Sequence, residues 1–222
     1  MKKLNIQNYT HFSFDLWLTL LQSHKEYKPK RDQLFKTFFD LKNAQEEVSQ
    51  AIRYYDVAST KISEITGKHI ERSEIYLLIL SHLGVDISTI NINILEDFFS
   101  LTERLFLEYP PKLMYPNILE LFNKIQSEGK TINILSNTAF ILGKSLHKVL
   151  NNYHLTPYLS FEIYSDEVGI AKPNPDIFEI LYQKANEIRP ISKKQIIHIG
   201  DNQNADYNGA KKTGLQAFWI EK

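Results

Sequence analysis

Four short runs of polar residues follow apolar segments that have the composition of β-strands. Six side chains in these runs could take part in chemistry, and in chain order they are Asp15, Ser136, Asn137, Lys172, Asp201 and Asp206. Carboxylates, a hydroxyl, an amide and an ammonium group are the types that phosphoryl transfer uses. Any one of them alone is more typical of a helix cap or a turn, so the prediction rests on the ordered set.

Each residue type suits one part of such a reaction. The carboxylate of Asp15 can attack phosphorus and form an aspartyl-phosphate. Ser136 and the backbone N–H groups after it can hold phosphate oxygens at a helix N-terminus. Lys172 can neutralise charge on the nucleophile and on the phosphate. Asp201, with Asp206 nearby, offers the hard oxygen ligands that Mg²⁺ prefers.

The segments that would position these residues alternate between two hydrophobic periods. Strand-like segments cover residues 11–14, 131–136, 161–164, 196–199 and 215–220. Helix-like segments cover 116–129, about 142–150, the stretch from Pro175 to about 188, and 204–213. Alternating strands and helices predict an α/β fold with a Rossmann-like parallel sheet. Ligands of such sheets bind beyond the carboxyl ends of the strands, where all four polar runs lie.

The middle of the chain has only the helical period. Val48, Ile52, Ile62 and Ile65 follow it, and so does a later series from Leu95. We therefore predict an inserted all-helical cap domain of about four helices at residues 22–108. The core domain would consist of residues 1–21 and 109–222.

Composition excludes several classes of protein. The 222 residues are 43% hydrophobic and carry 26 basic and 26 acidic side chains. A balanced charge gives no bulk attraction to nucleic acid or to an acidic membrane surface. The absence of cysteine excludes disulfides and thiolate chemistry. No apolar run approaches the ~20 residues that span a bilayer. We expect a cytoplasmic protein that binds neither nucleic acid nor membrane, and the sequence does not indicate its oligomeric state.

The polar runs and their flanks resemble the four motifs of the haloacid dehalogenase (HAD) superfamily. The matching segments are Phe12-Ser13-Phe14-Asp15 with Thr19, Ile134-Leu135-Ser136-Asn137, Glu167 to Phe178 with Ala171-Lys172-Pro173, and Ile199-Gly200-Asp201-Asn202 through Asp206 to Gly214. The likeness covers residues 10–21 and 109–222. The helical insert resembles the C1 cap that closes over the active site in one branch of this family.

The resemblance implies a Mg²⁺-dependent hydrolase of the phosphatase type that acts in two steps on a small phosphorylated substrate. Asp15 would be the nucleophile, and water would then hydrolyse the covalent intermediate. The implied metal ligands are Asp15, the backbone carbonyl of Trp17, Asp201 and, directly or through water, Asp206. The implied phosphate-binding residues are Thr19, Ser136, Asn137 and Lys172.

Trp17 departs from the pattern of the family phosphatases. They carry a second aspartate at this position, which protonates the leaving group and later activates water. Tryptophan cannot transfer a proton, and general acid–base catalysis typically contributes about 10²–10⁴-fold. An ordinary alkyl phosphatase is therefore a weaker interpretation than the other motifs alone would indicate.

Several alternatives stay open. The substrate could have a good leaving group, or a cap residue such as His24, Glu26 or Tyr27 could supply the proton. The chain could be a weak or inactive relative that only binds a ligand. It could also be a haloacid dehalogenase, whose family members have an aromatic residue at this position and need no metal, or a phosphonatase. We interpret His198 as a packed core residue rather than a ligand.

Overall fold

A five-stranded sheet forms the centre of the computed structural model, which describes residues 5–221. Its strand order is β5 (Phe161–Tyr164), β4 (Thr131–Ser136), β1 (His11–Phe14), β6 (Ile196–Gly200) and β7 (Gln216–Trp219). All four neighbouring pairs are parallel, as the alternation of strands and helices predicted. The strand segments of the sequence are confirmed to within one residue at each end. The chain thus has the predicted α/β Rossmann-like fold.

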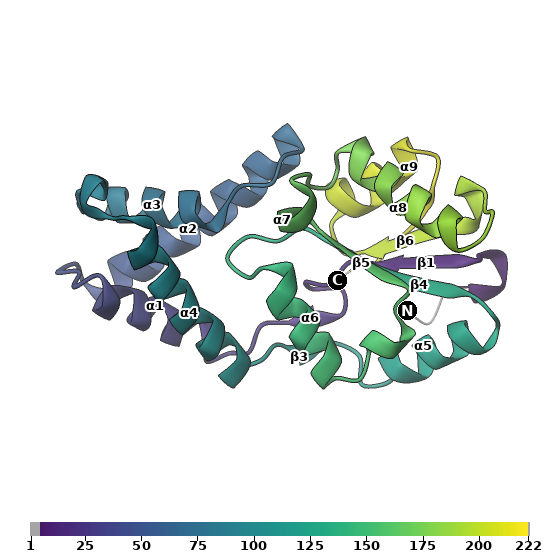
Figure 1. The fold of residues 1–222 in the computed structure, drawn as a ribbon, viewed down its shortest axis with the longest axis horizontal. Helices are drawn as coiled ribbons and strands as arrows, with labels where there is room; N and C mark the ends of the chain where they lie inside the picture. Colours follow the sequence, from purple (N-terminus) through teal and green to yellow (C-terminus); the bar gives the residue numbers. More distant parts are fainter. Residues whose placement is uncertain (1–4, 222) are drawn as a thin grey trace.

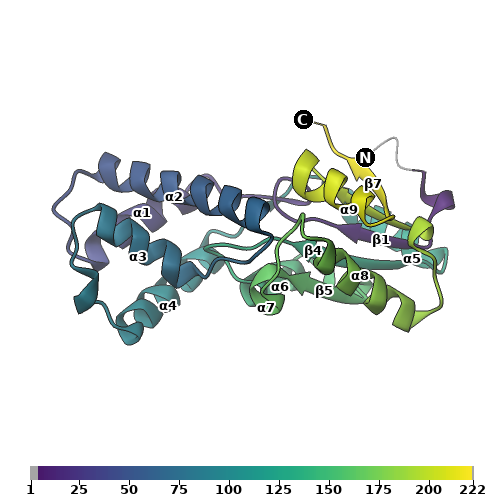
Figure 2. The ribbon, with the colours of Figure 1, turned by 90° about the horizontal axis from the view of Figure 1, so that it is seen from above.

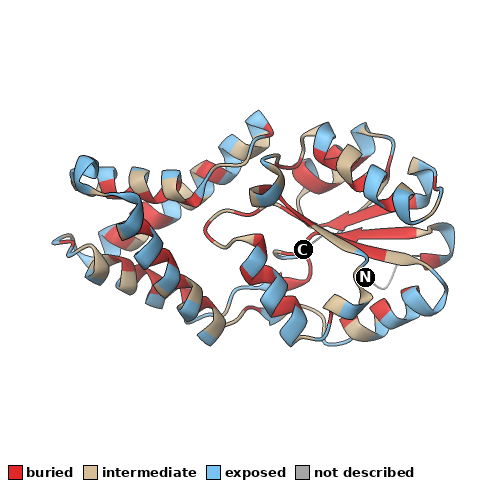
Figure 3. Cartoon of the chain, in the orientation of Figure 1, coloured by how far each residue is buried: buried red, intermediate tan, exposed pale blue. Residues whose placement is uncertain are grey.

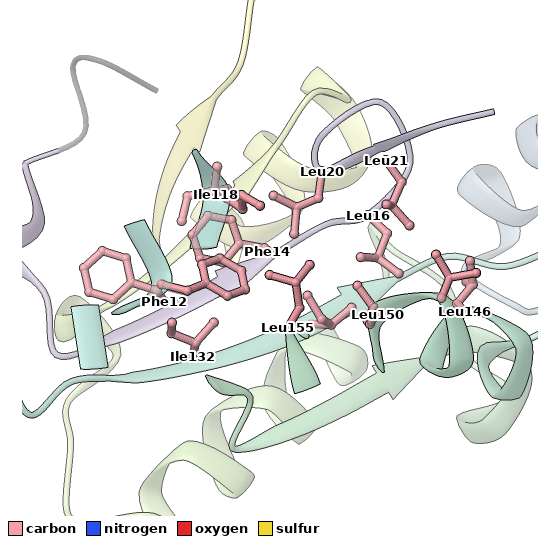
Figure 4. Packing of buried hydrophobic residues seen from close by; sticks show 14 of the residues in the cluster. Phe12, Phe14, Leu16, Leu20, Leu21, Ile118, Ile132, Leu146, Leu150 and Leu155 are labelled. Carbon is pink, nitrogen blue, oxygen red and sulfur yellow. The ribbon is translucent and has the colours of Figure 1, made fainter. Parts of the chain in front are cut away.

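Helices cover both faces of this sheet. Helices α5 (Ile118–Ser127) and α6 (Gly143–Asn152) lie on one face, and α8 (Pro175–Ile188) and α9 (Gly209–Lys212) lie on the other (Figures 1 and 2). The side chains of Phe12 and Phe14 pack with Phe122 toward α5, in the cluster that Figure 4 shows. A second cluster, which includes Leu181, fills the space under α8. Burial on both faces explains why the strands read as nearly continuous apolar runs (Figure 3).

The middle of the chain forms four α-helices beside the carboxyl ends of the strands (Figure 1). They are α1 (Tyr27–Phe38), α2 (Gln45–Thr66), α3 (Arg72–His82) and α4 (Ile92–Glu108). Their own hydrophobic cluster is centred on Phe35, Tyr76 and Phe98, each at most 1% exposed. We call these four helices the helical insert. The division of the chain into two domains at residues 22 and 108 stays a prediction.

Short elements account for most differences from the predicted secondary structure. An antiparallel pair, β2 (Leu21–Gln22) with β3 (Lys112–Leu113), connects the insert to the core, and α7 (Ser165–Val168) follows β5. The predicted helix at 204–213 is a π-helix, Gln203–Asn208, followed by α9. Short 3₁₀ helices cover Ile6–Asn8, Ile87–Thr89, Thr156–Tyr158 and Lys193–Gln195. Elements of two to six residues are too short to show a hydrophobic period.

Helix α2 also departs from a simple amphipathic pattern. Val48 and Ile52 are fully buried, whereas Ile62 is 48% exposed and Ile65 is 84% exposed. The C-terminal part of α2 extends beyond the other helices of the insert toward the core (Figures 1 and 2).

No helix within residues 5–221 combines the length and the apolar character that crossing a membrane requires.

Candidate active site

A pocket of about 370 Å³ lies where the carboxyl ends of the strands face the helical insert. Its core side includes Asp15, Asn137, Lys172 and Asp201. This volume is at the small end of the range for ligand sites, which indicates a small molecule. The position agrees with the rule that ligands of open α/β sheets bind at the carboxyl ends of the strands.

The ammonium group of Lys172 is the centre of the hydrogen-bond network in this pocket. Its Nζ donates to Asp15 Oδ1 at 2.8 Å, to Asp206 Oδ1 at 2.7 Å and to the carbonyl oxygen of Leu135 at 2.8 Å. The side chain is almost completely buried. Burial opposes its charge, but Asp15 and Asp206 outweigh that effect and raise the pKa of Lys172. The lysine therefore stays charged and uses all three of its protons in fixed directions.

A third carboxylate, Asp201, lies beside the two that accept from Lys172. One oxygen from each of Asp15, Asp201 and Asp206 lies within 4.8 Å of the other two. Burial raises the pKa of Asp15 to about 7, and the charges of Asp206 and Asp201 add to this effect while Lys172 opposes it. Excess negative charge on hard oxygen donors at this spacing fits a divalent cation such as Mg²⁺.

Asp206 is held in place by neighbours from β6 and from the loop that follows it. Its Oδ1 lies 3.1 Å from His198 Nε2, and its Oδ2 accepts from the backbone N–H of Asn202 at 2.9 Å. Burial disfavours its charge, but Lys172 and His198 outweigh burial and hold the pKa of Asp206 below its usual range. A Cβ atom at Gly200 would lie 2.1 Å from the Asp206 carboxylate, so only glycine fits at that position.

His198 is buried, as we predicted from the sequence, and it also has polar contacts with two neighbouring side chains. Its ring is fully buried, and Nδ1 lies 2.9 Å from the hydroxyl of Ser13 on the adjacent strand. Burial lowers its pKa, so the ring is neutral near pH 7. A neutral ring that donates from Nε2 to Asp206 must accept at Nδ1 from Ser13. The alternation of side chains along β6 could have indicated this contact.

The loop after β1 brings Asp15 and Trp17 into the pocket. The backbone N–H of Asp15 donates to the carbonyl of Ile199 at 2.9 Å, which extends the β1–β6 ladder by one residue. The ring of Trp17 packs against Phe106 of α4, with ring centroids 6.4 Å apart. Thr19 is fully buried, and its hydroxyl lies 3.4 Å from Asp201 Oδ1.

The loop after β4 places Asn137 and Thr138 in the pocket wall. Asn137 and Lys172 exchange two hydrogen bonds of 2.8 and 2.9 Å through the amide side chain of Asn137 and the backbone of Lys172. Ser136 is fully buried, and neither it nor Thr19 lines the pocket in the described part of the chain. Thr138, which sequence reasoning missed, donates from its hydroxyl to Asp166 at 2.6 Å.

The structure therefore brings together most of the predicted site. The pocket-lining residues among the predictions are Asp15, Trp17, Asn137, Lys172, Asp201 and Asp206. The insert adds residues that the sequence did not single out, including Arg31 and Glu64. Glu64 accepts from the side-chain amide of Asn202 at 2.6 Å and so joins α2 to the loop after β6. The roles assigned to these residues, including metal binding by the carbonyl of Trp17, stay predictions.

Comparison with known proteins agrees with the motif resemblance. The pyrimidine 5'-nucleotidase YjjG of Escherichia coli (strain K12) is 29% identical over 106 residues, which is 47% of this chain and 44% of that protein. The (S)-2-haloacid dehalogenase 2 of Pseudomonas sp. (strain CBS-3) is 24% identical over 108 residues, 49% of this chain and 44% of that protein. The chain spans less than half the length of the first curated relatives that it matches, 40% to 44%.

Solved structures share the fold at low sequence identity. The HAD hydrolase YfnB from Bacillus subtilis, bound to magnesium, has a TM-score of 0.66 at 18% identity and covers 96% of this chain and 86% of its own. The profile described as haloacid dehalogenase-like hydrolase matches residues 9–214. On these findings, this chain belongs to the haloacid dehalogenase-like hydrolases.

Proposed function

We propose that the chain is a Mg²⁺-dependent hydrolase of the phosphatase type that acts on a small phosphorylated compound. The observation that carries the proposal is the cluster of Asp15, Asp201 and Asp206, of which Asp15 and Asp206 accept from the ammonium group of Lys172. Relatives named as a nucleotidase and as a phosphoserine phosphatase support the phosphoryl substrate.

In this proposal Asp15 attacks phosphorus with one carboxylate oxygen, and the leaving group departs from the opposite side. Lys172, 2.8 Å from Asp15 Oδ1, holds the attacking carboxylate and neutralises charge on the phosphoryl group. Asp15, Asp201, Asp206 and the carbonyl of Trp17 would hold Mg²⁺. When bound, the cation would reduce the repulsion between an anionic nucleophile and an anionic substrate. Water then attacks the aspartyl-phosphate and releases phosphate.

Trp17 bears on which leaving groups this site can expel. It stands where the family phosphatases have a proton-donating aspartate, and its indole ring packs on Phe106 instead. A leaving group that is stable as an anion needs no proton. We therefore infer that acyl phosphates, anhydrides or aryl phosphates react faster here than alkyl phosphates, by up to the roughly 10²–10⁴-fold that general acid catalysis supplies.

Phosphate release from acetyl phosphate, p-nitrophenyl phosphate and ethyl phosphate tests the proposal, with Mg²⁺ and with a chelator. We expect turnover of the first two that requires Mg²⁺ and that Asp15→Asn abolishes. Asp97→Asn, on the exposed face of α4, is the matched control. If the wild-type protein were no more active than Asp15→Asn on any substrate, catalysis would be rejected and the chain would be a protein that only binds its ligand. Trp17→Asp should raise activity on ethyl phosphate relative to p-nitrophenyl phosphate.

A dehalogenase is the second candidate, and the aromatic side chain of Trp17 in the pocket favours it. A halide leaving group needs no proton, and a haloacid dehalogenase is among the relatives. This reaction predicts halide release from 2-chloropropionate that a chelator does not reduce. Product release measured with Mg²⁺ and with a chelator, as phosphate for one candidate and as halide for the other, therefore separates them.

A further inference from the structure

The turn between α2 and α3 lies against the segment of the core that carries Lys172. Lys68 of this turn forms an isolated antiparallel bridge with Ile170. Two backbone hydrogen bonds, of 3.1 and 3.2 Å, flank this pair, and each side donates one of them. We call residues 67–69 together with residues 169–171 the insert bridge. The helical insert thus contacts the chain one residue before Lys172.

Gly67 allows the two segments to approach this closely. It follows α2 with a φ of 67°, a conformation that glycine adopts without strain. Its carbonyl oxygen accepts from the N–H of Ala171 at 3.1 Å and from the side-chain amide of Asn174 at 3.2 Å. A Cβ atom at Gly67 would lie 2.8 Å from the Cβ of Asn174. A larger residue at this position would therefore push the insert away from the Lys172 segment.

The Lys172 segment is held from two sides. On the core side, the side-chain amide of Asn137 binds the backbone N–H and carbonyl of Lys172. On the other side, the insert bridge holds residues 169–171. Within residues 5–221, the backbone of residues 169–171 has no hydrogen bond to the core outside residues 165–174, although the side chain of Ile170 packs against the cluster under α8. The insert therefore supplies the polar contacts that fix the chain directly before Lys172.

The same end of α2 reaches the other core loops at the site. The carboxylate of Glu64 accepts from the side-chain amide of Asn202 at 2.6 Å, in the loop after β6. The Nδ1 atom of His69 lies 3.1 Å from the hydroxyl of Ser165, which accepts from the backbone N–H of Thr138 at 2.8 Å. The end of α2 thus bonds directly to the segments after β5 and β6 and, through Ser165, to the loop after β4.

We propose that residues 64–69 are positioning residues for Lys172, so that its ammonium group keeps its three directions only while the insert bridge is formed. Lys172 Nζ donates to Asp15, Asp206 and the carbonyl of Leu135 over 2.7 to 2.8 Å, and such bonds tolerate little movement of the backbone that carries the side chain. The insert then acts on the reacting groups without touching them. Its effect on turnover rests on the proposed function, whereas its effect on the order of the segment does not.

Amide hydrogen exchange measures the order of this segment without any substrate. Gly67→Ala should open the insert bridge and speed exchange at Ala171, whose N–H bonds to the insert. If the insert positions Lys172, exchange also becomes about tenfold faster at the Lys172 amide, whose partner is Asn137 on the core. Gly84→Ala is the matched control, because Gly84 lies in the insert at a φ of 84° but a Cβ there meets no atom within 4 Å. It should leave both amides unchanged.

An engineered disulfide tests the effect on turnover. Lys68 and Ile170 form a non-hydrogen-bonded antiparallel pair, and the Cα atoms of such pairs lie about 4.5 Å apart, within the range that a disulfide spans. The chain has no cysteine, so Lys68→Cys with Ile170→Cys gives one bond that a reductant opens. We expect Gly67→Ala to lower kcat for p-nitrophenyl phosphate in Mg²⁺ about tenfold. The oxidised disulfide should restore most of this loss in the Gly67→Ala protein, and reductant should remove the gain. Lys68→Cys without its partner is the control and should not respond to oxidation.

Two results would overturn the proposal. The first is exchange in Gly67→Ala that becomes faster at Ala171 and stays unchanged at Lys172. The second is a kcat of Gly67→Ala that equals the wild-type value or that the oxidised disulfide does not restore.

The disulfide also decides the question if Gly67→Ala fails to fold. Oxidation in the otherwise unchanged chain should slow exchange at the Lys172 amide, and equal exchange in the oxidised and reduced proteins would overturn the proposal. A wild-type protein that turns over no substrate would reject the proposed function. The exchange measurements would then still show whether the insert positions Lys172.

Discussion

The crowding of carboxylates makes a prediction about stability that does not depend on knowing the substrate. Asp15→Asn removes one negative charge from a cluster of three carboxylates, of which Asp15 and Asp206 share the ammonium group of Lys172. We expect this variant to be more stable than the wild-type protein when no metal is present. The Asn side chain has nearly the same size and can still accept from Lys172, so its packing changes little.

The magnitude follows from the raised pKa of Asp15. Burial raises it from 3.8 to about 7. At a pH above both values, a difference of about 3 pKa units lowers the free energy of unfolding of the wild-type protein by at most about 4 kcal/mol. The stronger hydrogen bond from Lys172 to the charged carboxylate is already included in this net shift. We therefore expect Asp15→Asn to be more stable by up to about 4 kcal/mol at pH 8 without metal.

The sign of the pH dependence follows from the same pKa. Because the folded-state value lies above the unfolded value, the folded protein binds the Asp15 proton more tightly. That contribution to stability is complete below about pH 4 and is lost as the pH rises through about 7. The advantage of Asp15→Asn should therefore be absent near pH 4, grow between pH 4 and 7, and stay constant above that range.

Metal binding should reduce the stability advantage of Asp15→Asn. A cation bound only to the folded state stabilises it by about 1.4 kcal/mol at ten times its Kd. Mg²⁺ should give this increase to the wild-type protein and much less to Asp15→Asn. The assay is urea unfolding followed by circular dichroism, with a chelator and with Mg²⁺, at several pH values and with Asp97→Asn as control. An Asn variant that is less stable than wild type at pH 8 in chelator would refute the reasoning, as would equal stabilisation of both proteins by Mg²⁺.

Three further predictions concern other parts of the chain. Burial lowers the pKa of His11 to about 4, so its contribution to stability, present above pH 6.5, is lost as the pH falls. Between pH 7 and pH 5 the free energy of unfolding of the wild-type protein should therefore fall by about 2 kcal/mol. Urea unfolding of His11→Gln should not show this fall, and His24→Gln, the control, should behave like the wild type. Tyr27→Phe should raise the free energy of unfolding by up to about 1 kcal/mol, because it removes a buried hydroxyl without a partner, and a lower melting temperature would contradict this. Glu64→Ala should speed amide hydrogen exchange in the last turn of α2 without changing the melting temperature, since it removes the contact with Asn202.

The sequence predicted the core half of the site because the topology of a parallel sheet fixes it. Asp15 and Asp201 each follow a strand, and the two strands are neighbours, so their carboxyl ends must meet. Hydrophobic periods and turn residues were sufficient to place the strands. The same reasoning brought Lys172 to this edge of the sheet, in the run that follows a strand, but its contact with Asp15 depends on the path of a loop.

The insert half of the site could not be predicted in the same way. A helical period shows which face of α1 is apolar, but it does not show how that helix lies against the sheet. Arg31 therefore looked like an ordinary insert residue, and Tyr27 was only one of three possible proton donors, until the fold placed both in the pocket with Asp15. The π-helix at Gln203–Asn208 also escaped prediction, because its six residues read as the start of a longer α-helix.

Phe106 connects the two unusual features of the pocket. Trp17 packs against one part of its ring and Tyr27 against another, with centroid distances of 6.4 and 5.4 Å. An aspartate at position 17 would be too short to reach this ring, so the aromatic contact and the usual proton donor exclude each other at that position. The contact places an apolar wall beside the reacting groups, where it excludes water and strengthens electrostatic interactions with a bound anion. In the proposed function, tryptophan at position 17 would therefore withhold the usual proton and also strengthen the holding of an anionic substrate, and the first effect favours a leaving group that departs without a proton.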